Sequence, residues 1–246
     1  MRSWSWHRLS EVCAPRRGSR TVGRVLGGGR GQLITTALAI AALAVVLPGA
    51  AAFAQSQQKY EVAGFRDARF GMNERDVRAV LEKDFGKISV NRSVNPIEGT
   101  TVLTARLASL DPGPGPAEVA YILGHSSKKL IQVNVIWSGD DSKKKTDTDA
   151  MVAAGTRLQR YFAGYAWNKD TTRAGIPVGP NTVVLFSGED DKKGAVRLII
   201  DGVKYQMQRK GKEMTSPDPA GPPKLIINYI ADRNDPDIAK IKKGKF

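Results

Sequence analysis

The segment GHSSKK, residues 124–129, holds the residues of this chain that come nearest to a catalytic group: His125 beside Ser126 and Ser127. A nucleophilic serine needs a histidine base that is itself oriented by a carboxylate. Adjacent residues of a tight turn do not point at one another in that way, and the sequence has no G-x-S-x-G elbow. We therefore interpret His125 as an exposed turn residue, and we predict no catalytic residues and no enzymatic activity.

An enzymatic alternative stays open. In it, the chain is a hydrolase or transferase of wall polymers, and His125 or a carboxylate pair such as Glu189 and Asp190 acts as acid or base. The carboxylate pair lies in a charged stretch between two expected strands, where a hairpin tip is the favoured interpretation because a glycosidase acid needs a desolvating cleft.

Metal and cofactor sites are not predicted. Beyond residue 54 the chain has one histidine and no cysteine, so a typical zinc site cannot be assembled. Two aspartate-rich segments could bind calcium, but one lacks the glycine and distal glutamate of a calcium loop and the other is interleaved with lysines. We interpret both as solvated loops. Their acidic and amide residues are Asp232, Asn234, Asp235 and Asp237 in the first, and Asp140, Asp141, Asp147 and Asp149 in the second.

One long connection, residues 208–223, is the predicted partner-binding element. Irregular connections of this length inside a domain are often binding elements. Its candidate contact residues are Arg209, Lys210, Lys212 and Met214, and a proline-rich stretch follows them. No aromatic residues interleave with these cations, so we predict no nucleic-acid binding. The expected partner is an envelope protein or an anionic envelope polymer.

A helix over about residues 74–84 is the element most firmly predicted. Asn73 and Asp76 have the spacing of a capping box, Met72 and Val77 that of a hydrophobic staple, and Gly86 stands where the helix should end. These residues need no role beyond starting and ending a helix.

The same stretch carries a resemblance. Gly71-Met72-Asn73-x-x-Asp76-Val77-x-x-x-Leu81 resembles the G-M-T-x-x-E-V-x-x-L motif of small periplasmic domains in which a helix precedes an antiparallel sheet. These include the β-lactamase-inhibitory-protein-like fold and the small lipoproteins of outer-membrane protein assembly. The resemblance implies a helix-plus-sheet architecture and a role in binding or assembly.

Alternating apolar residues predict the rest of the fold. A short strand precedes the first helix, and three strands follow it near residues 102–110, 119–123 and 131–137. A second helix is predicted where Met151, Ala154, Leu158 and Phe162 share a face, and three strands follow it at 182–186, 195–200 and 224–230. The class is α+β, with the order β-α-βββ and then α-βββ, which is compatible with two similar halves.

The first 54 residues have the pattern of a secretory signal peptide. An arginine-rich start precedes the apolar run 33–47, a Pro-Gly break and a small-x-small site, which predicts cleavage between Ala54 and Gln55. An uncleaved N-terminal membrane anchor is the alternative. We therefore expect a periplasmic protein whose mature chain does not span the membrane, with a first half at 55–138, a second half at 139–231 and a basic, flexible tail at 232–246.

Together these observations favour an exported, basic bacterial envelope protein that acts as a non-catalytic binding or assembly module. The alternative from another class is a surface protein that binds anionic lipid, lipopolysaccharide or wall polymer, whose affinity should fall steeply with salt.

Overall fold

The computed structural model describes residues 57–139, 144–209 and 212–240 of the 246-residue chain. The predicted signal segment 1–54 and its cleavage site, Ala54 and Gln55, lie outside the described residues. The elements follow in the order β1 Gly64–Phe65, β2 Ala68–Arg69, α1 Glu74–Phe85, β3 Val90–Val94, β4 Thr101–Leu107, β5 Ala117–Leu123, β6 Leu130–Ser138, α2 Lys144–Ala163, β7 Arg173–Pro177, β8 Val183–Glu189, β9 Ala195–Asp201, β10 Gln206–Arg209, β11 Lys212–Thr215 and β12 Lys224–Ile230.

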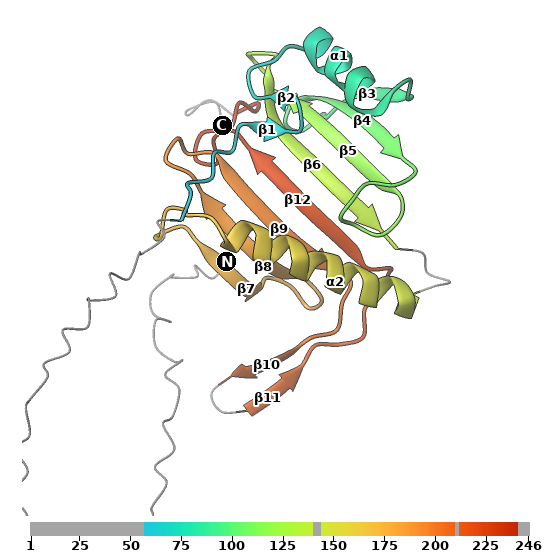
Figure 1. The fold of residues 1–246 in the computed structure, drawn as a ribbon, viewed down its shortest axis with the longest axis vertical. Helices are drawn as coiled ribbons and strands as arrows, with labels where there is room; N and C mark the ends of the chain where they lie inside the picture. Colours follow the sequence, from blue (N-terminus) through green and yellow to red (C-terminus); the bar gives the residue numbers. More distant parts are fainter. Residues whose placement is uncertain (1–56, 140–143, 210–211, 241–246) are drawn as a thin grey trace, which may run out of the picture. The chain divides into compact units, whose positions relative to one another are not determined.

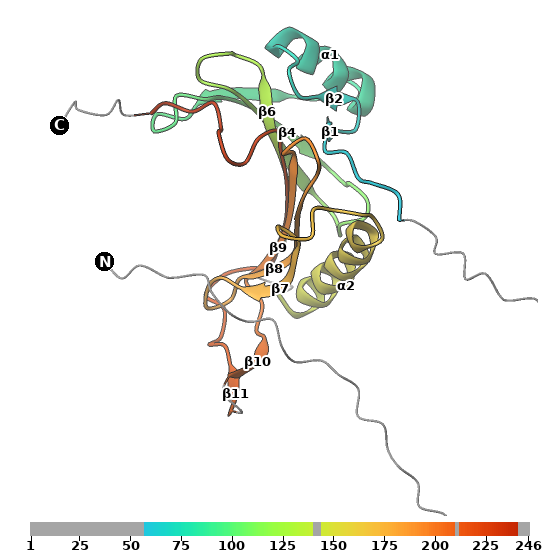
Figure 2. The same ribbon diagram turned by 90° about the vertical axis from the view of Figure 1, so that its left-hand side faces the viewer.

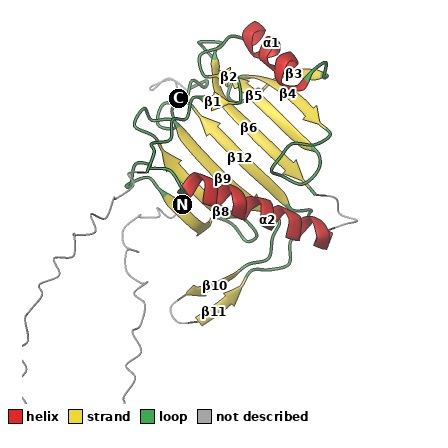
Figure 3. Ribbon diagram, viewed as in Figure 1, coloured by secondary structure: helices red, strands yellow, loops and turns green. Residues whose placement is uncertain are grey.

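The centre of the fold is one eight-stranded antiparallel sheet with the strand order β3-β4-β5-β6-β12-β9-β8-β7 (Figure 1). The last strand of the described residues, β12, lies in the middle, between β6 and β9. Figure 3 distinguishes the two helices (red) from the strands (yellow), and along the chain each helix is followed by a run of strands. The predicted α+β class is confirmed.

Both helices cover the same face of the sheet (Figure 2). Their buried residues, among them Leu81 of α1 and Phe162 of α2, join one hydrophobic cluster with inward-facing residues of the strands. We call the side of the sheet that carries this cluster the helix face and the opposite side the open face. No helix of the described part of the chain is both long and apolar enough to cross a membrane.

Helix α1 begins as its sequence predicts. The Asn73 side chain accepts a hydrogen bond from the Asp76 backbone N–H at 3.0 Å, and the Asp76 carboxylate accepts from the Asn73 N–H at 3.4 Å. The helix ends before Gly86, whose φ of 74° a residue with a side chain rarely adopts. Local chemistry therefore accounts for both ends of this helix.

Two strands of the sheet were not predicted. The expected order places three strands after each helix, but β3 follows α1 directly and β7 follows α2 directly, so four strands of the sheet follow each helix. Both additional strands lie at sheet edges, and their residues are almost all exposed. A strand with no buried side lacks the alternation of apolar residues that identifies strands in a sequence.

The segment before α1 also differs from its prediction. In place of one strand it forms a small hairpin, in which β1 pairs with β2. The chain reverses at Arg66, whose φ is 52°, after Gly64, where an added Cβ would lie 2.0 Å from the Ala68 carbonyl oxygen. Each strand of this hairpin has two residues.

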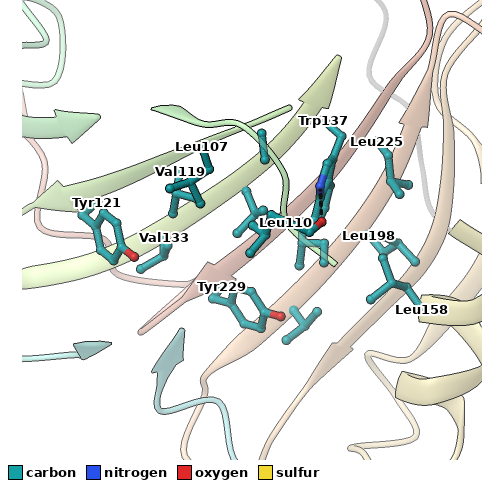
Figure 4. Close-up of a cluster of buried hydrophobic side chains, with 14 of the residues drawn as sticks. Leu107, Leu110, Val119, Tyr121, Val133, Trp137, Leu158, Leu198, Leu225 and Tyr229 are labelled. Carbon is teal, nitrogen blue, oxygen red and sulfur yellow. Dashed lines mark hydrogen bonds between the residues drawn. The ribbon is translucent and has the colours of Figure 1, made fainter. Parts of the chain in front are cut away.

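The helix face is packed around aromatic residues. Trp137 of β6 is fully buried and donates a hydrogen bond from its indole Nε1 to the Leu110 carbonyl at 2.8 Å, which Figure 4 shows as a dashed line. The β4–β5 loop approaches the same ring so closely that a Cβ on Gly113 would lie 2.3 Å from its Cε2 atom. The loop thus covers the part of the sheet between the two helices.

Candidate functional site

The open face of the sheet carries residues that do not belong to the helix-face cluster. Successive side chains of a strand point to opposite faces, so each residue paired across the sheet with an open-face residue also lies on the open face. Val184 illustrates the assignment: it is buried, with 4% of its surface exposed, yet it is not part of the helix-face cluster.

A continuous apolar row crosses five neighbouring strands of the open face. Ile136 of β6 pairs with Ile226 of β12, which pairs with Ile199 of β9. Ile199 pairs in turn with Val184 of β8, and Val184 with Ile176 of β7. The four isoleucines are half-buried and lie outside the helix-face cluster. We call these five residues the isoleucine row.

Polar residues lie beside the isoleucine row. Two residues along each strand from Ile136 and Ile226, Asn134 of β6 pairs with Asn228 of β12. The Asn228 amide donates a hydrogen bond to the Asn134 side-chain oxygen at 2.8 Å. Gln132 donates to the same oxygen at 2.7 Å. An apolar strip with a polar border of this kind has the composition of a protein-contact surface.

The hairpin β10–β11 projects from the strand ends nearest the isoleucine row (Figure 1). The hairpin lies in the connection between β9 and β12. The last residue of β9, Asp201, pairs with the first residue of β12, Lys224, and these lie two residues from Ile199 and Ile226. The predicted irregular connection 208–223 is thus wrong in its first part, which forms a hairpin. Two short strands with charged and polar residues at most positions show no apolar alternation, so the sequence did not indicate them.

Three of the predicted partner-binding residues, Arg209, Lys212 and Met214, belong to the strands of this hairpin. Arg209 and Lys212 pair at the end of its ladder, and Met214 is exposed over 46% of its surface. Lys210 lies outside the described residues, as do the side chains of Arg209 and Lys212. The structure therefore places the backbones of Arg209, Lys212 and Met214 in one hairpin.

His125 lies in the exposed β5–β6 turn, and its ring does not meet a carboxylate. The ring Nδ1 lies 3.3 Å from the Gly99 carbonyl oxygen. The nearby Asp237 carboxylate instead accepts hydrogen bonds from the backbone N–H groups of Ser126 and Ser127 at 2.9 and 2.8 Å. Hydrogen bonds from the Ser127 hydroxyl and from these backbone groups lower the pKa of Asp237 to about 2. This arrangement fixes the β5–β6 turn.

The carboxylate pair at the β8–β9 turn has a structural arrangement as well. Asp190 is buried and accepts hydrogen bonds from the N–H groups of Val62, Lys192 and Gly194, each at 2.8 Å. Glu189 lies 3.4 Å from Arg233. The Asp190 carboxylate thus joins the segment before β1 to the β8–β9 turn.

The aspartates considered for calcium have separate partners. Asp232 accepts from the backbone N–H of Asn234 at 2.8 Å, Asp235 pairs with Lys240, and Asp237 holds the β5–β6 turn. Within the described ranges no three histidine, cysteine or acidic side chains are grouped as a metal site would require. Asp140 and Asp141 lie outside the described residues.

Sequence reasoning did not single out the isoleucine row, although a signal for it exists. In NVIW, RLII and LIIN, apolar residues fall on consecutive positions, so both faces of these strands are apolar. Such runs are expected where a sheet is covered on both sides. Here the helices cover one side, and the second apolar set is the isoleucine row.

Comparison with protein-family models, with curated proteins and with solved structures finds no match. The resemblance carried by Gly71 to Leu81 therefore stays a prediction. The function proposed below is therefore argued from the arrangement of the described residues.

Proposed function

We propose that this protein is a non-catalytic binding module of the bacterial envelope, which binds a protein partner through the open face of its sheet. The observation that carries the proposal is the isoleucine row, five apolar side chains in register across β6, β12, β9, β8 and β7. Apolar patches with polar borders on protein surfaces mark interaction sites.

The hairpin β10–β11 supplies the second part of the proposed interface. Met214 is exposed, and methionine adapts its shape to a partner at little energetic cost. Arg209, Lys210 and Lys212 add positive charge beside it. In this proposal the sheet provides the apolar centre and the hairpin provides a basic arm that selects an acidic partner.

Export is part of the proposal and rests on sequence. The arginine-rich start, the apolar run and the small-x-small site before Gln55 support secretion to the periplasm. The partner is then another envelope protein, and the chromosome is not a ligand.

We also infer that the two halves of the sheet are copies of one unit. Its support is the order of elements: a helix and four strands of the sheet, then a second helix and four strands, with β6 and β12 antiparallel at the centre. In this interpretation the hairpin β10–β11 is an addition to the second copy alone.

The proposal is tested by placing a photo-crosslinking residue, p-benzoylphenylalanine, at position 199 and, as a control, at position 152. Ile199 is in the isoleucine row, whereas Val152 is an α2 residue with 44% of its surface exposed. We expect a discrete crosslinked protein from envelope extract with the label at 199 and none with the label at 152.

A matched pair of lysine variants gives the second readout. Ile226→Lys places a charge in the isoleucine row and should abolish capture of the crosslinked protein, whereas Val152→Lys should leave capture unchanged. Capture that survives Ile226→Lys would contradict the proposal. Retention of only lipid or glycan, lost at high salt, would favour the anion-binding alternative and point to Arg209, Lys210 and Lys212.

A further inference from the structure

A cleft on the helix side of the molecule combines aromatic walls with two arginines. It lies between the segment that contains β1 and β2 and the end of β12, and its volume is about 550 Å³, which is in the range of small-molecule sites. Its lining residues are Tyr60, Glu61, Ala63, Gly64, Phe65, Arg66, Arg69 and Tyr229. We call it the arginine cleft.

Aromatic rings form part of the lining of the arginine cleft, beside its polar groups. The rings of Phe65 and Tyr229 lie with their centroids 5.6 Å apart and their planes 33° from parallel. The ring of Tyr60 is held from behind by Trp167, on which it stacks at 4.7 Å. Ring faces fixed in this way offer a surface for a planar apolar ligand.

The arginine cleft carries two positive charges, on Arg66 and Arg69, beside the one negative charge of Glu61. Neither Arg66 nor Arg69 forms an ion pair with any residue that the structure describes: the Arg69 guanidinium donates to the Arg66 carbonyl oxygen, and the Arg66 guanidinium lies 4.6 Å from the centre of the Phe85 ring. Both guanidinium groups are thus held by neutral partners, and their charge remains available.

Two of the acidic residues near these arginines are engaged by lysines, and a third, Asp84, accepts a hydrogen bond from the Asp67 backbone N–H at 3.4 Å. Glu61, on the rim, lies 2.7 Å from the Lys192 ammonium group. Asp67, between the two arginines in sequence, lies 2.6 Å from the Lys83 ammonium group. The local balance therefore favours an anion from solution, and guanidinium groups bind carboxylate and sulfonate oxygens by charge-assisted hydrogen bonds.

We propose that the arginine cleft binds a small organic anion, with its carboxylate or sulfonate at Arg66 and Arg69 and its planar apolar body against the rings of Tyr60, Phe65 and Tyr229. The site is separate from the isoleucine row, which lies on the opposite face of the sheet, so it does not depend on the proposed partner interface.

The test uses the dye 1-anilinonaphthalene-8-sulfonate as the planar anion and N-phenyl-1-naphthylamine as its uncharged counterpart. We expect the purified protein to bind the sulfonate dye, and Arg66→Gln/Arg69→Gln to weaken this binding by at least about tenfold, because two charge-assisted hydrogen bonds are lost. Binding of the uncharged dye should change little. Because Trp167 stacks on the wall of the cleft, the bound sulfonate dye should also quench its fluorescence in the wild type but not in the double variant.

Two control variants decide where the dye binds. Arg75→Gln/Arg173→Gln removes the same charge from exposed positions outside the cleft and should bind the dye as the wild type does. Ile199→Lys alters the open face and should also leave dye binding intact. Equal binding by the cleft double variant, an equal loss in the control double variant, or loss in Ile199→Lys would overturn the proposal. Far-ultraviolet circular dichroism of each variant shows that the fold is retained.

Discussion

Leu198 and Ile199 are neighbours in β9 and differ only in the position of their methyl branch, yet they belong to two different environments. Leu198 is fully buried in the helix-face cluster, between the sheet and α2. Ile199 is half-buried in the isoleucine row on the open face. The difference separates residues that hold the fold together from residues that the fold leaves available for a partner.

The largest difference between the two residues is expected when each is replaced by alanine. Leu198→Ala removes buried atoms and leaves a cavity, so we expect it to lower the free energy of unfolding by about 2–5 kcal/mol. Ile199→Ala should lower it by only about 1 kcal/mol, because its side chain already contacts water. Urea denaturation of both variants measures the two values. Equal losses would mean that the open face is also part of the core.

A second prediction concerns how the segment before α1 is held on the helix face. The Asp190 carboxylate accepts hydrogen bonds from three backbone N–H groups, and Asp190→Asn turns an amide N–H₂ group towards at least one of them. We therefore expect the free energy of unfolding to fall by about 1–3 kcal/mol. Asp191→Asn is the control. Its carboxylate forms an exposed pair with Lys59, and its loss should change stability by no more than about 1 kcal/mol.

The third prediction tests whether the motif that opens α1 is structural. Asn73→Ala removes the cap of a helix on the helix face and should cost about 1 kcal/mol of stability in thermal or urea unfolding. Asn91→Ala, at an exposed position of the edge strand β3, should cost less. If Asn73→Ala abolished partner capture without any change in stability, the motif would belong to the interface instead.

The smallest effect is expected at Asp237, which joins the segment after β12 to the β5–β6 turn. Its folded pKa of about 2 is below the ordinary value of 3.8, so its stabilising contribution is complete above about pH 4 and is lost as the pH falls towards 2. Asp237→Asn should therefore melt at a lower temperature than the wild type at pH 5. The difference should shrink at pH 2, and a difference that stayed constant would show that the carboxylate charge is not its cause.

The helix face could be predicted from sequence because its signals are local. The capping residues of α1, the apolar face of α2 and the alternation in β4, β5 and β6 each depend on residues close together in the chain. The edge strands β3 and β7 could not be predicted in this way, because they bury almost nothing and are held by hydrogen bonds to one neighbouring strand.

The candidate sites depend on contacts between distant parts of the chain. The isoleucine row requires β12 to insert between β6 and β9, and no local pattern specifies that order. The arginine cleft requires Tyr229 to meet Phe65, residues that are far apart in sequence. The sequence predicts partner binding by Arg209, Lys210, Lys212 and Met214, but this prediction does not include the sheet surface near the hairpin.

The hairpin β10–β11 is closed at its base as well as along its ladder. The Ser216 N–H donates to the Tyr205 carbonyl at 2.9 Å, the Tyr205 N–H donates to the Ser216 hydroxyl at 3.0 Å, and the Tyr205 hydroxyl donates to the Gly179 carbonyl at 2.7 Å. Residues 206–215 thus leave and rejoin the sheet domain at a single hydrogen-bonded point. We therefore expect that residues 206–215 can be replaced by a loop of another length or by a reporter peptide while β9 and β12 keep their register.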